Sequence, residues 1–254
     1  MKKGFMGKIA ELVKESDIVL EVLDARFPEE TRNHAIERRV LEKGKALVLV
    51  INKADLVSKE KIEEEKKEMI GRTKARVVFV SAKEKNGVRL LKREIRMASP
   101  KGKGSVIVGL LGYPNAGKST IINALSGKGK GKVRTSAKAG FTRGLQKIKI
   151  AEGLYLLDAP GIIPYEERDE FGLFLVGAKN ANQLKDFETV ALKVVSELGT
   201  GEIAEKLGVK GFEGDEEDLL ETVALKKRWL VSGGKGDVKR AARELLEMYQ
   251  RNEL

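Results

Sequence analysis

The chain has 254 residues, 41% hydrophobic and 34% charged, which is enough apolar content for one sizeable core and a smaller appendage. It contains no cysteine, and this excludes disulfides, thiolate metal sites and cysteine nucleophiles. The net charge of +11 favours a polyanionic partner such as nucleic acid, because clustered lysine and arginine displace counterions from phosphates, with a charge-rich surface of the thermophile type as the alternative.

Apolar strands and charged helices alternate through the first hundred residues. Such alternation predicts right-handed crossovers and an α/β fold with a parallel sheet covered on both faces. Strands are predicted within 17–24, 46–55 and 77–83, and helices within 34–44, 59–71 and 88–98.

The middle of the chain continues this pattern after a flexible tether at 99–104. A buried strand at 105–112 leads into a helix at 118–127. The following segment, 126–144, is rich in glycine and lysine without an apolar period, which predicts a mobile loop. Two more strands, within 146–151 and 154–161, complete the predicted core.

Beyond Pro164 the pattern changes to helices without strands. We therefore place a domain boundary there and expect domains at 1–163 and 164–254. The helices are predicted within 171–180, 187–198, 202–209, 218–230 and 238–250.

No segment of the sequence has the pattern of a membrane span. The longest apolar runs, at 46–51 and 106–111, have strand length and fall far short of the ~20 residues that a membrane helix needs. The basic start, MKKGFMGK, is followed at once by charged residues rather than by the apolar region of a secretory signal. We expect a cytoplasmic protein that makes no membrane contact.

Residues 112–119, GYPNAGKS, match the phosphate-loop pattern G-x-x-x-x-G-K-[ST]. The glycines let successive backbone N–H groups point at phosphates, and the following helix offers its positive N-terminal end. Lys118 would reach the β- and γ-phosphates, and the Ser119 hydroxyl would bind Mg²⁺. The motif follows a predicted strand and opens a predicted helix, which is the context that such a loop requires.

A second motif, NKAD at 52–55, ends a predicted strand, where ligands bind in open parallel sheets. The Asp55 carboxylate can accept hydrogen bonds from N1–H and the amine of guanine, whereas adenine offers neither donor there. Asn52 would brace the loop, and the stem of Lys53 would cover the ring. Alone this motif is also consistent with a surface loop, but with the phosphate loop it predicts guanine-nucleotide binding.

Three further elements complete a nucleotide site. In DAPG, Asp158 can hold Mg²⁺ through a water, and the Gly161 N–H can sense the γ-phosphate. Thr142 would supply a second hydroxyl to the metal, with a solvated loop threonine as the alternative. The Ala82 N–H within SAK, at 81–83, could bond the guanine carbonyl oxygen.

The predicted site residues form three groups. The GTP contacts are Asn52, Lys53, Asp55, Ser81, Ala82, Lys83, Asn115, Ala116, Gly117, Lys118, Ser119, Thr120, Asp158 and Gly161. The metal ligands are Ser119, Thr142 and, through water, Asp158, and catalysis is assigned to Lys118, Thr142 and Gly161.

These five elements are similar to the guanine-nucleotide motifs of Ras-like P-loop GTPases, but in the order NKAD, SAK, GYPNAGKS, Thr142, DAPG. The set resembles a circularly permuted GTPase. Moreover, DARFPEETRN at 24–33 and the tail at 230–250 resemble the YlqF/RbgA family of ribosome-assembly GTPases.

The resemblance implies a GTPase domain whose base-recognition half precedes its phosphate half. It also implies a helical C-terminal domain at 164–254 that binds RNA or the ribosome. The implied activity is GTP hydrolysis with Mg²⁺, as a switch in assembly of the large ribosomal subunit, with that subunit and its RNA as partners. Because DAPG runs directly into the second domain, hydrolysis could reposition that domain. We also expect a monomer.

The sequence departs from these families at the catalytic positions. Ile162 stands where Ras-like enzymes place the glutamine that orients the attacking water, and Phe5 stands where YlqF-like proteins have a histidine. The single histidine, His34, is read as a solvated or capping side chain. Slow intrinsic hydrolysis, stimulated by the ribosomal partner, is the expected result. Asn115 resembles a residue that helps to hold K⁺ beside the phosphates in related GTPases.

Several alternatives stay open at this point. A nucleotide-tuned RNA-binding protein with little turnover is the second reading, and an ATP-dependent RNA factor is disfavoured by Asp55. Arg26 is expected either to pair with Asp24 or to contact another molecule. The lysines within 126–132 and 221–229 are either RNA contacts or solvated charges. Trp229 and Leu230 are expected on an amphipathic helix, in the C-terminal core, with a base-stacking platform as the alternative.

Overall fold

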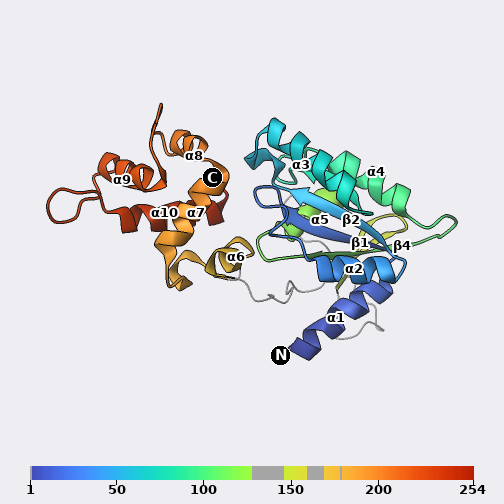
Figure 1. Ribbon diagram of the computed structural model, residues 1–254. Coiled ribbons are helices and arrows are strands. Elements are labelled where there is room, and N and C mark those ends of the chain that lie inside the picture. The colour runs from blue at the N-terminus through green and yellow to red at the C-terminus, as the bar shows by residue number, and fades with distance from the viewer. Residues whose placement is uncertain (1, 128–145, 159–168, 178) are drawn as a thin grey trace. The chain divides into compact units, whose positions relative to one another are not determined.

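The computed structural model describes residues 2–127, 146–158, 169–177 and 179–254 (Figure 1). The chain divides into two compact units, Met1–Pro164 and Tyr165–Leu254. None of the helices described is long and apolar enough to cross a membrane.

The first unit is built on a six-stranded sheet with the order β3-β2-β1-β4-β6-β5. Its strands are β1 (Ile18–Asp24), β2 (Ala46–Asn52), β3 (Arg76–Val80), β4 (Val106–Gly112), β5 (Gln146–Ala151) and β6 (Leu154–Asp158). The strands from β3 to β6 in this order pair in parallel, as the alternation of strands and helices predicts.

The edge strand β5 differs from the prediction of a wholly parallel sheet, because it runs antiparallel to β6. Only the turn residues Glu152 and Gly153 separate the two strands, and Gly153 has φ +67°. Such a connection is too short for a crossover, so the two strands can pair only as a hairpin.

In the described part of the first unit, five α-helices flank the sheet. They are α1 (Lys2–Glu15), α2 (His34–Glu42), α3 (Lys59–Arg72), α4 (Val88–Ala98) and α5 (Lys118–Ser126), with a short 3₁₀ turn, η1 (Ala54–Leu56). Asn33 and Ser58 cap α2 and α3 by accepting hydrogen bonds from backbone N–H groups of the first turn. These caps explain why α2 and α3 begin where the sequence predicts.

Both faces of the sheet are buried. On one face, Ile18, Leu20 and Val22 of β1 share a core with apolar residues of α4 and α5. The alternate residues of the same strand, Val19 and Leu23, are equally buried, which requires cover on the opposite face. There α1 contacts β4 and α2 contacts β2.

The second unit is helical. Its elements are α6 (Glu170–Leu175), η2 (Ala181–Gln183), α7 (Phe187–Leu198), α8 (Thr200–Lys206), α9 (Glu216–Lys226) and α10 (Val238–Arg251). Helix α10 packs on both α7 and α9, and the rings of Phe174 and Tyr249 meet in the core with 5.3 Å between their centroids.

Helix α9 ends four residues earlier than predicted, at Lys226. Arg228 has φ +55°, which an α-helix cannot contain, and the chain turns into a hairpin in which Leu230 bridges Gly236. Leu230 is 56% exposed and Trp229 is half-buried. The prediction that these two residues lie on a helix, in the C-terminal core, is therefore wrong.

Candidate guanine-nucleotide site

The loop between β4 and α5 adopts a conformation that its glycines make possible. Gly112 and Gly117 have φ +145° and φ +95°, in the region that side chains rarely adopt. A Cβ on Gly117 would lie 2.2 Å from Asn52 Nδ2, and one on Gly112 would lie 2.6 Å from the Val22 oxygen. The two glycines therefore allow the loop to lie directly against the ends of β1 and β2.

Lys118 opens helix α5 and bends back over this loop. Its ammonium donates hydrogen bonds to the carbonyl oxygens of Gly112, at 2.7 Å, and Tyr113, at 2.6 Å. Ser119 and Thr120 follow it on the first turn of α5 and are exposed. A phosphate bound at this helix N-terminus would meet a cation, hydroxyls and the positive end of the helix together.

Asn52 joins the two halves of the site. It is 3% exposed, and its Nδ2 donates to the Ala116 carbonyl in the phosphate loop, at 3.0 Å. Its Oδ1 accepts from the Ala82 N–H, at 3.1 Å. The NKAD and SAK segments are thus tied to the phosphate loop by one side chain. Donation from Ala82 to the guanine carbonyl stays a prediction.

The other base-recognition residues lie beside Asn52. Asp55 is exposed within η1, and Lys83 is exposed after the end of β3. Ser81 is buried, and its Oγ accepts a hydrogen bond from the Glu84 N–H, at 3.3 Å, which closes the turn. The exposed Asp55 carboxylate is accessible to a ligand at this edge of the sheet.

A buried ion-pair cluster lies under Lys53. The Asp24 carboxylate, at the end of β1, accepts hydrogen bonds from Arg26 Nη2, at 2.8 Å, and from Lys53 Nζ, at 2.7 Å. Burial alone would raise the pKa of Asp24, but the two cations outweigh it and lower this pKa to about 2. Arg26 therefore pairs with Asp24, one of its two expected roles.

Sequence reasoning did not predict the contact between Asp24 and Lys53. It depends on the parallel register that places Asp24 beside Asn52 at the ends of neighbouring strands. Lys53 itself has φ +64°, and this conformation aims its side chain back toward β1.

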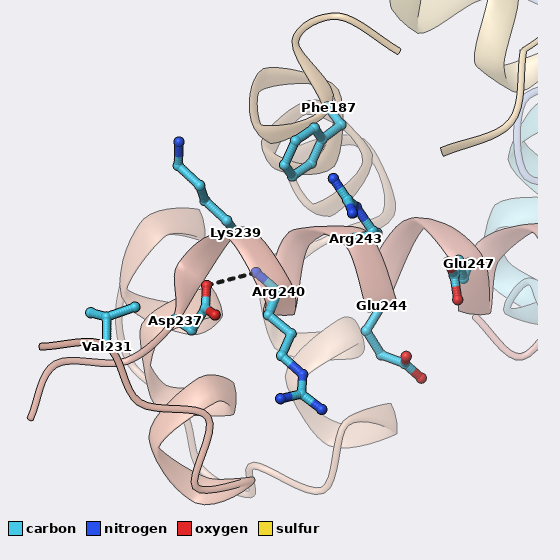
Figure 2. Close-up of a pocket in the computed structure, with 8 residues that line it drawn as sticks. All are labelled: Phe187, Val231, Asp237, Lys239, Arg240, Arg243, Glu244 and Glu247. Atoms are coloured by element: carbon cyan, nitrogen blue, oxygen red, sulfur yellow. Dashed lines mark hydrogen bonds between the residues drawn. The ribbon is translucent and has the colours of Figure 1, made fainter. Parts of the chain in front are cut away.

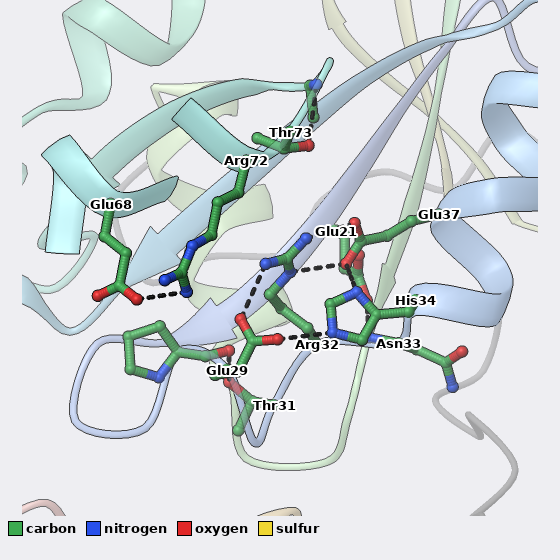
Figure 3. Close-up of polar contacts among 12 residues, drawn as sticks. Glu21, Glu29, Thr31, Arg32, Asn33, His34, Glu37, Glu68, Arg72 and Thr73 are labelled. Atoms are coloured by element: carbon green, nitrogen blue, oxygen red, sulfur yellow. Dashed lines mark hydrogen bonds and ion pairs between the residues drawn. The ribbon is translucent and has the colours of Figure 1, made fainter. Parts of the chain in front are cut away.

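A second polar cluster lies at the start of helix α2 (Figure 3). It contacts the phosphate loop through Tyr113. The Glu21 Oε1 accepts from the Asn33 N–H, at 2.8 Å, and Asn33 Nδ2 donates to the hydroxyl of Tyr113, at 3.3 Å. Arg32 binds Glu37 through two hydrogen bonds of 2.8 Å. Burial, together with repulsion from Glu37, raises the pKa of Glu21 well above its ordinary value.

The single histidine lies at the first residue of α2. The His34 side chain is 62% exposed, and its Nε2 lies 2.6 Å from Glu29 Oε1. It is thus a solvated side chain at a helix start, as expected. Phe5 lies within α1.

Part of the predicted site falls outside the described residues, namely Thr142, Gly161 and Ile162. Asp158 ends β6 next to Leu110 of β4, so its backbone lies at the same sheet edge as the phosphate loop. Within the described ranges, no group of three His, Cys, Asp or Glu side chains could hold a metal. The exposed Ser119 on the first turn of α5 and the end of β6 at Asp158 fit a Mg²⁺ ion that takes its other ligands from phosphates and water.

Comparison with known proteins places this site in a family. A family model described as RsgA GTPase matches residues 13–167, and one described as 50S ribosome-binding GTPase matches residues 107–231. The chain is 40% identical over its full length to the uncharacterized GTP-binding protein MJ1464 of Methanocaldococcus jannaschii and spans 67% of it. It is 29% identical over 99% of its length to nuclear/nucleolar GTPase 2 of Arabidopsis thaliana but spans only 44% of that protein.

Two solved structures share the fold of this chain. GDP-bound YlqF matches with a TM-score of 0.68 at 24% identity, covering 97% of this chain and 95% of that chain. GNP-bound YlqF from T. maritima matches with a TM-score of 0.66 at 23% identity, covering 99% and 95%. The circularly permuted arrangement expected from the motif order is thus confirmed. The chain belongs to the RsgA GTPase family and is a GTP-binding GTPase with a circularly permuted nucleotide domain and a C-terminal helical region.

Proposed function

We propose that the chain hydrolyses GTP to GDP and phosphate as a switch in assembly of the large ribosomal subunit. The observation that carries the nucleotide part is Asn52, whose amide is bonded to Ala116 of the phosphate loop and to Ala82 of the SAK segment. One buried side chain thus holds base recognition and phosphate recognition in a fixed relation, although the two motifs are far apart in sequence.

The proposed roles follow from the residues at this edge of the sheet. Lys118 would exchange its two carbonyl acceptors for β- and γ-phosphate oxygens, because an anionic acceptor binds an ammonium more strongly. Ser119 and, through water, Asp158 would hold Mg²⁺, which neutralises phosphate charge when bound. Thr142 and Gly161 would complete the metal shell and sense the γ-phosphate. Asp55 would select guanine.

The group that orients the attacking water is proposed to come from the partner. Ile162 and Phe5, at the two positions where related enzymes carry a glutamine or a histidine, are hydrocarbons and cannot hydrogen-bond water. Intrinsic hydrolysis would therefore be slow. Asn115, exposed and with φ +60°, is proposed to help hold K⁺ beside the phosphates. Equal hydrolysis rates in potassium and sodium buffers would contradict that role.

The second unit offers a surface suited to RNA. The ring of Trp229 lies 4.8 Å from Lys227 Nζ and 4.6 Å from the Arg240 guanidinium. Cations and aromatic rings placed together can hold phosphates and stack on unpaired bases. This arrangement supports the proposal that residues 164–254 contact ribosomal RNA.

A groove beside Trp229 extends this surface (Figure 2). Its lining comprises the apolar Phe187 and Val231, the cations Lys239, Arg240 and Arg243, and the acids Asp237, Glu244 and Glu247. The Arg243 guanidinium lies 4.8 Å from the Phe187 ring. We call Trp229, Phe187 and the three α10 cations the C-terminal basic face. The similarity to the 50S ribosome-binding GTPase family and to a nuclear/nucleolar GTPase supports the same partner.

Co-sedimentation with purified large ribosomal subunits tests this function. We expect tighter binding with a non-hydrolysable GTP analogue than with GDP, and weaker binding in both states when Lys239, Arg240 and Arg243 are changed to Gln. Equal binding with both nucleotides would contradict a switch. Cytoplasmic location and a monomeric state remain predictions.

A second candidate is an RNA-binding protein that GTP tunes with little or no turnover. The hydrocarbon side chains at positions 5 and 162 favour it. Turnover measured with the ribosomal partner present separates it from the switch.

A further inference from the structure

The positive charge of this protein is unevenly divided between its two units. Lysine and arginine outnumber aspartate and glutamate in residues 1–164, whereas acids outnumber bases in residues 165–254. The net charge of +11 therefore originates in the nucleotide unit. Any contact with a polyanion should involve a surface of that unit as well as the C-terminal basic face.

Helix α4 carries such a surface. Arg89, Lys92, Arg93 and Arg96 recur at the spacing of one helix face, and all four are exposed. We call these four residues the α4 cationic stripe. The opposite face of the helix, with Val88, Leu91 and Ile95, is buried in the sheet core and holds the stripe toward solvent.

The α4 cationic stripe differs from an ordinary solvated helix face. Helix α3 of the same unit interleaves both signs of charge, and its Arg72 and Lys66 pair with acids one turn away. On α4 the single acid is Glu94, which pairs with Arg76 and Arg93.

The charges of the α4 cationic stripe destabilise the helix that carries them. The first turn of α4 contains no acid, although a helix N-terminus favours negative charge. Arg89 with Arg93, and Lys92 with Arg96, are like-charged pairs at a spacing of four, which weakens a helix. Helix α4, held by its buried apolar face, thus presents mainly positive charge that weakens the helix rather than stabilising it.

We propose that the α4 cationic stripe binds the phosphate backbone of double-helical RNA. From Arg89 to Arg96 the stripe is about 10 Å long at 1.5 Å per residue, a distance over which one strand of a duplex passes about three phosphates. Leu90 and Met97, 48% and 60% exposed, flank it and would lie against the sugars. Arginine and lysine on phosphates position a protein without reading sequence.

RNA is chosen over other polyanions on the strength of the proposed ribosomal function. The α4 cationic stripe contains none of the residues predicted to contact the nucleotide and none of the C-terminal basic face. A shallow pocket lined by Arg89, Leu90, Lys92, Arg93 and Arg96 follows the stripe. Its lining is four cations and one apolar side chain, which suits the phosphate anions and the sugars of an RNA backbone.

The test measures binding of the full chain to an RNA duplex over a series of salt concentrations. The duplex has about 20 base pairs, which is longer than the ~16 that a double-stranded-RNA-binding domain spans. The test variant changes the four residues of the α4 cationic stripe to Gln, a good helix former. The matched control changes Lys59, Lys66, Lys67 and Arg72 of α3 to Gln, and so removes the same charge from exposed positions of a neighbouring element. GDP affinity and melting temperature are measured for both variants.

We expect the α4 variant to lose about 10- to 100-fold in RNA affinity near 0.1 M salt and the salt slope to fall by about 3, one for each lost phosphate contact. The α3 control should lose much less, and both variants should bind GDP as the wild type does. If the wild type binds RNA and the two variants lose RNA affinity equally, the assignment of RNA binding to the α4 cationic stripe is wrong. The proposed ribosomal function is then unaffected. If the wild type does not bind the duplex, the assignment of the stripe to RNA is wrong, whereas the proposed ribosomal function is decided by co-sedimentation with the subunits. If the α4 variant bound RNA normally but lost affinity for ribosomal subunits, the stripe would contact a ribosomal protein instead. The assignment of RNA binding to the stripe would then also be wrong.

Discussion

Asp55 tests base recognition at the scale of one residue. Its carboxylate is expected to accept from N1–H and the amine of guanine, so an amide at this position would present a donor where guanine also has a donor. We expect Asp55→Asn to weaken GDP binding by about 100-fold, as for the loss of charge-assisted hydrogen bonds. The same variant should bind xanthine nucleotide better than the wild type does, because xanthine carries an oxygen in place of the amine. Unchanged GDP affinity in a competition assay would contradict the assignment.

Asp24 tests the ion-pair cluster beneath Lys53. Asp24→Asn leaves Arg26 buried without its counter-charge, and we expect the free energy of unfolding at pH 7 to fall by about 3 kcal/mol. The pKa of Asp24 is lowered from 3.8 to about 2, so its contribution of about 2 kcal/mol is complete above pH 4 and is lost as the pH falls toward 2.

The matched control for Asp24 is Glu68→Gln, which breaks the exposed pair with Arg72 and should cost less than ~0.5 kcal/mol. Denaturant titrations at pH 7, 4 and 2 measure both variants. Equal costs for the two substitutions would show that the Asp24 cluster has no special stabilising role.

For Glu21 we expect the stability of the folded state to depend on pH in the opposite direction. Because its pKa is raised in the folded protein, the folded state keeps a proton that the unfolded chain has already lost, and stability falls as the pH rises above the unfolded pKa near 4.5. Glu21→Gln keeps an acceptor for the Asn33 N–H and removes this titration. The Gln variant should therefore gain stability relative to wild type between pH 5 and pH 8. A constant difference in melting temperature over that range would refute the raised pKa.

The sequence predicts individual site residues better than their partners. Lys118 and Asn52 could be assigned because their motifs define both residue type and strand-end position. The bonds from Lys53 and Arg26 to Asp24 could not, because they depend on the register between two strands. The cluster around Glu21 was also missed, since a lone acid in an apolar strand gives no sign of its pairing.

At the scale of elements, strong periodicity and caps predict well. Helices α2 to α5 begin within a residue of their predicted positions. Helix α1 was not predicted, because its charged sequence with two glycines has a weak apolar pattern, and tertiary contacts of Leu12 and Val13 bury it. The end of α9 was misplaced because the positive φ of Arg228 has no glycine or asparagine to signal it.

Gly109 of β4 tests how α1 is held on the sheet. A Cβ there would lie 2.3 Å from Ser16 Oγ and 2.6 Å from Leu12 Cδ2, so Gly109→Ala should displace α1 and cost about 1–3 kcal/mol. Hydrogen exchange in residues 7–16 should rise. Gly71→Ala in α3 is the control, since nothing lies within 4 Å of its Cβ, and it should stabilise by about 0.5–1 kcal/mol. Unchanged exchange in α1 would mean that the contact with Gly109 does not hold this helix.

At the scale of the molecule, permutation keeps the site intact while changing the order of its parts. Strand β1 pairs with both β2 and β4, so the NKAD strand and the phosphate-loop strand are joined through it. The hydrogen bond from Asn52 to the Ala116 carbonyl then joins the two motifs directly. The motif order alone was sufficient to predict this arrangement, because each motif is placed at a strand end regardless of where the chain begins.

The most direct measurement is GTP hydrolysis in potassium buffer, with and without purified large ribosomal subunits. We expect slow turnover by the protein alone and strong stimulation by the subunits, because the partner would supply the group that Ile162 and Phe5 do not provide. Absence of turnover in both conditions, despite tight and guanine-specific binding, would contradict the switch and favour an RNA-binding protein that GTP only tunes.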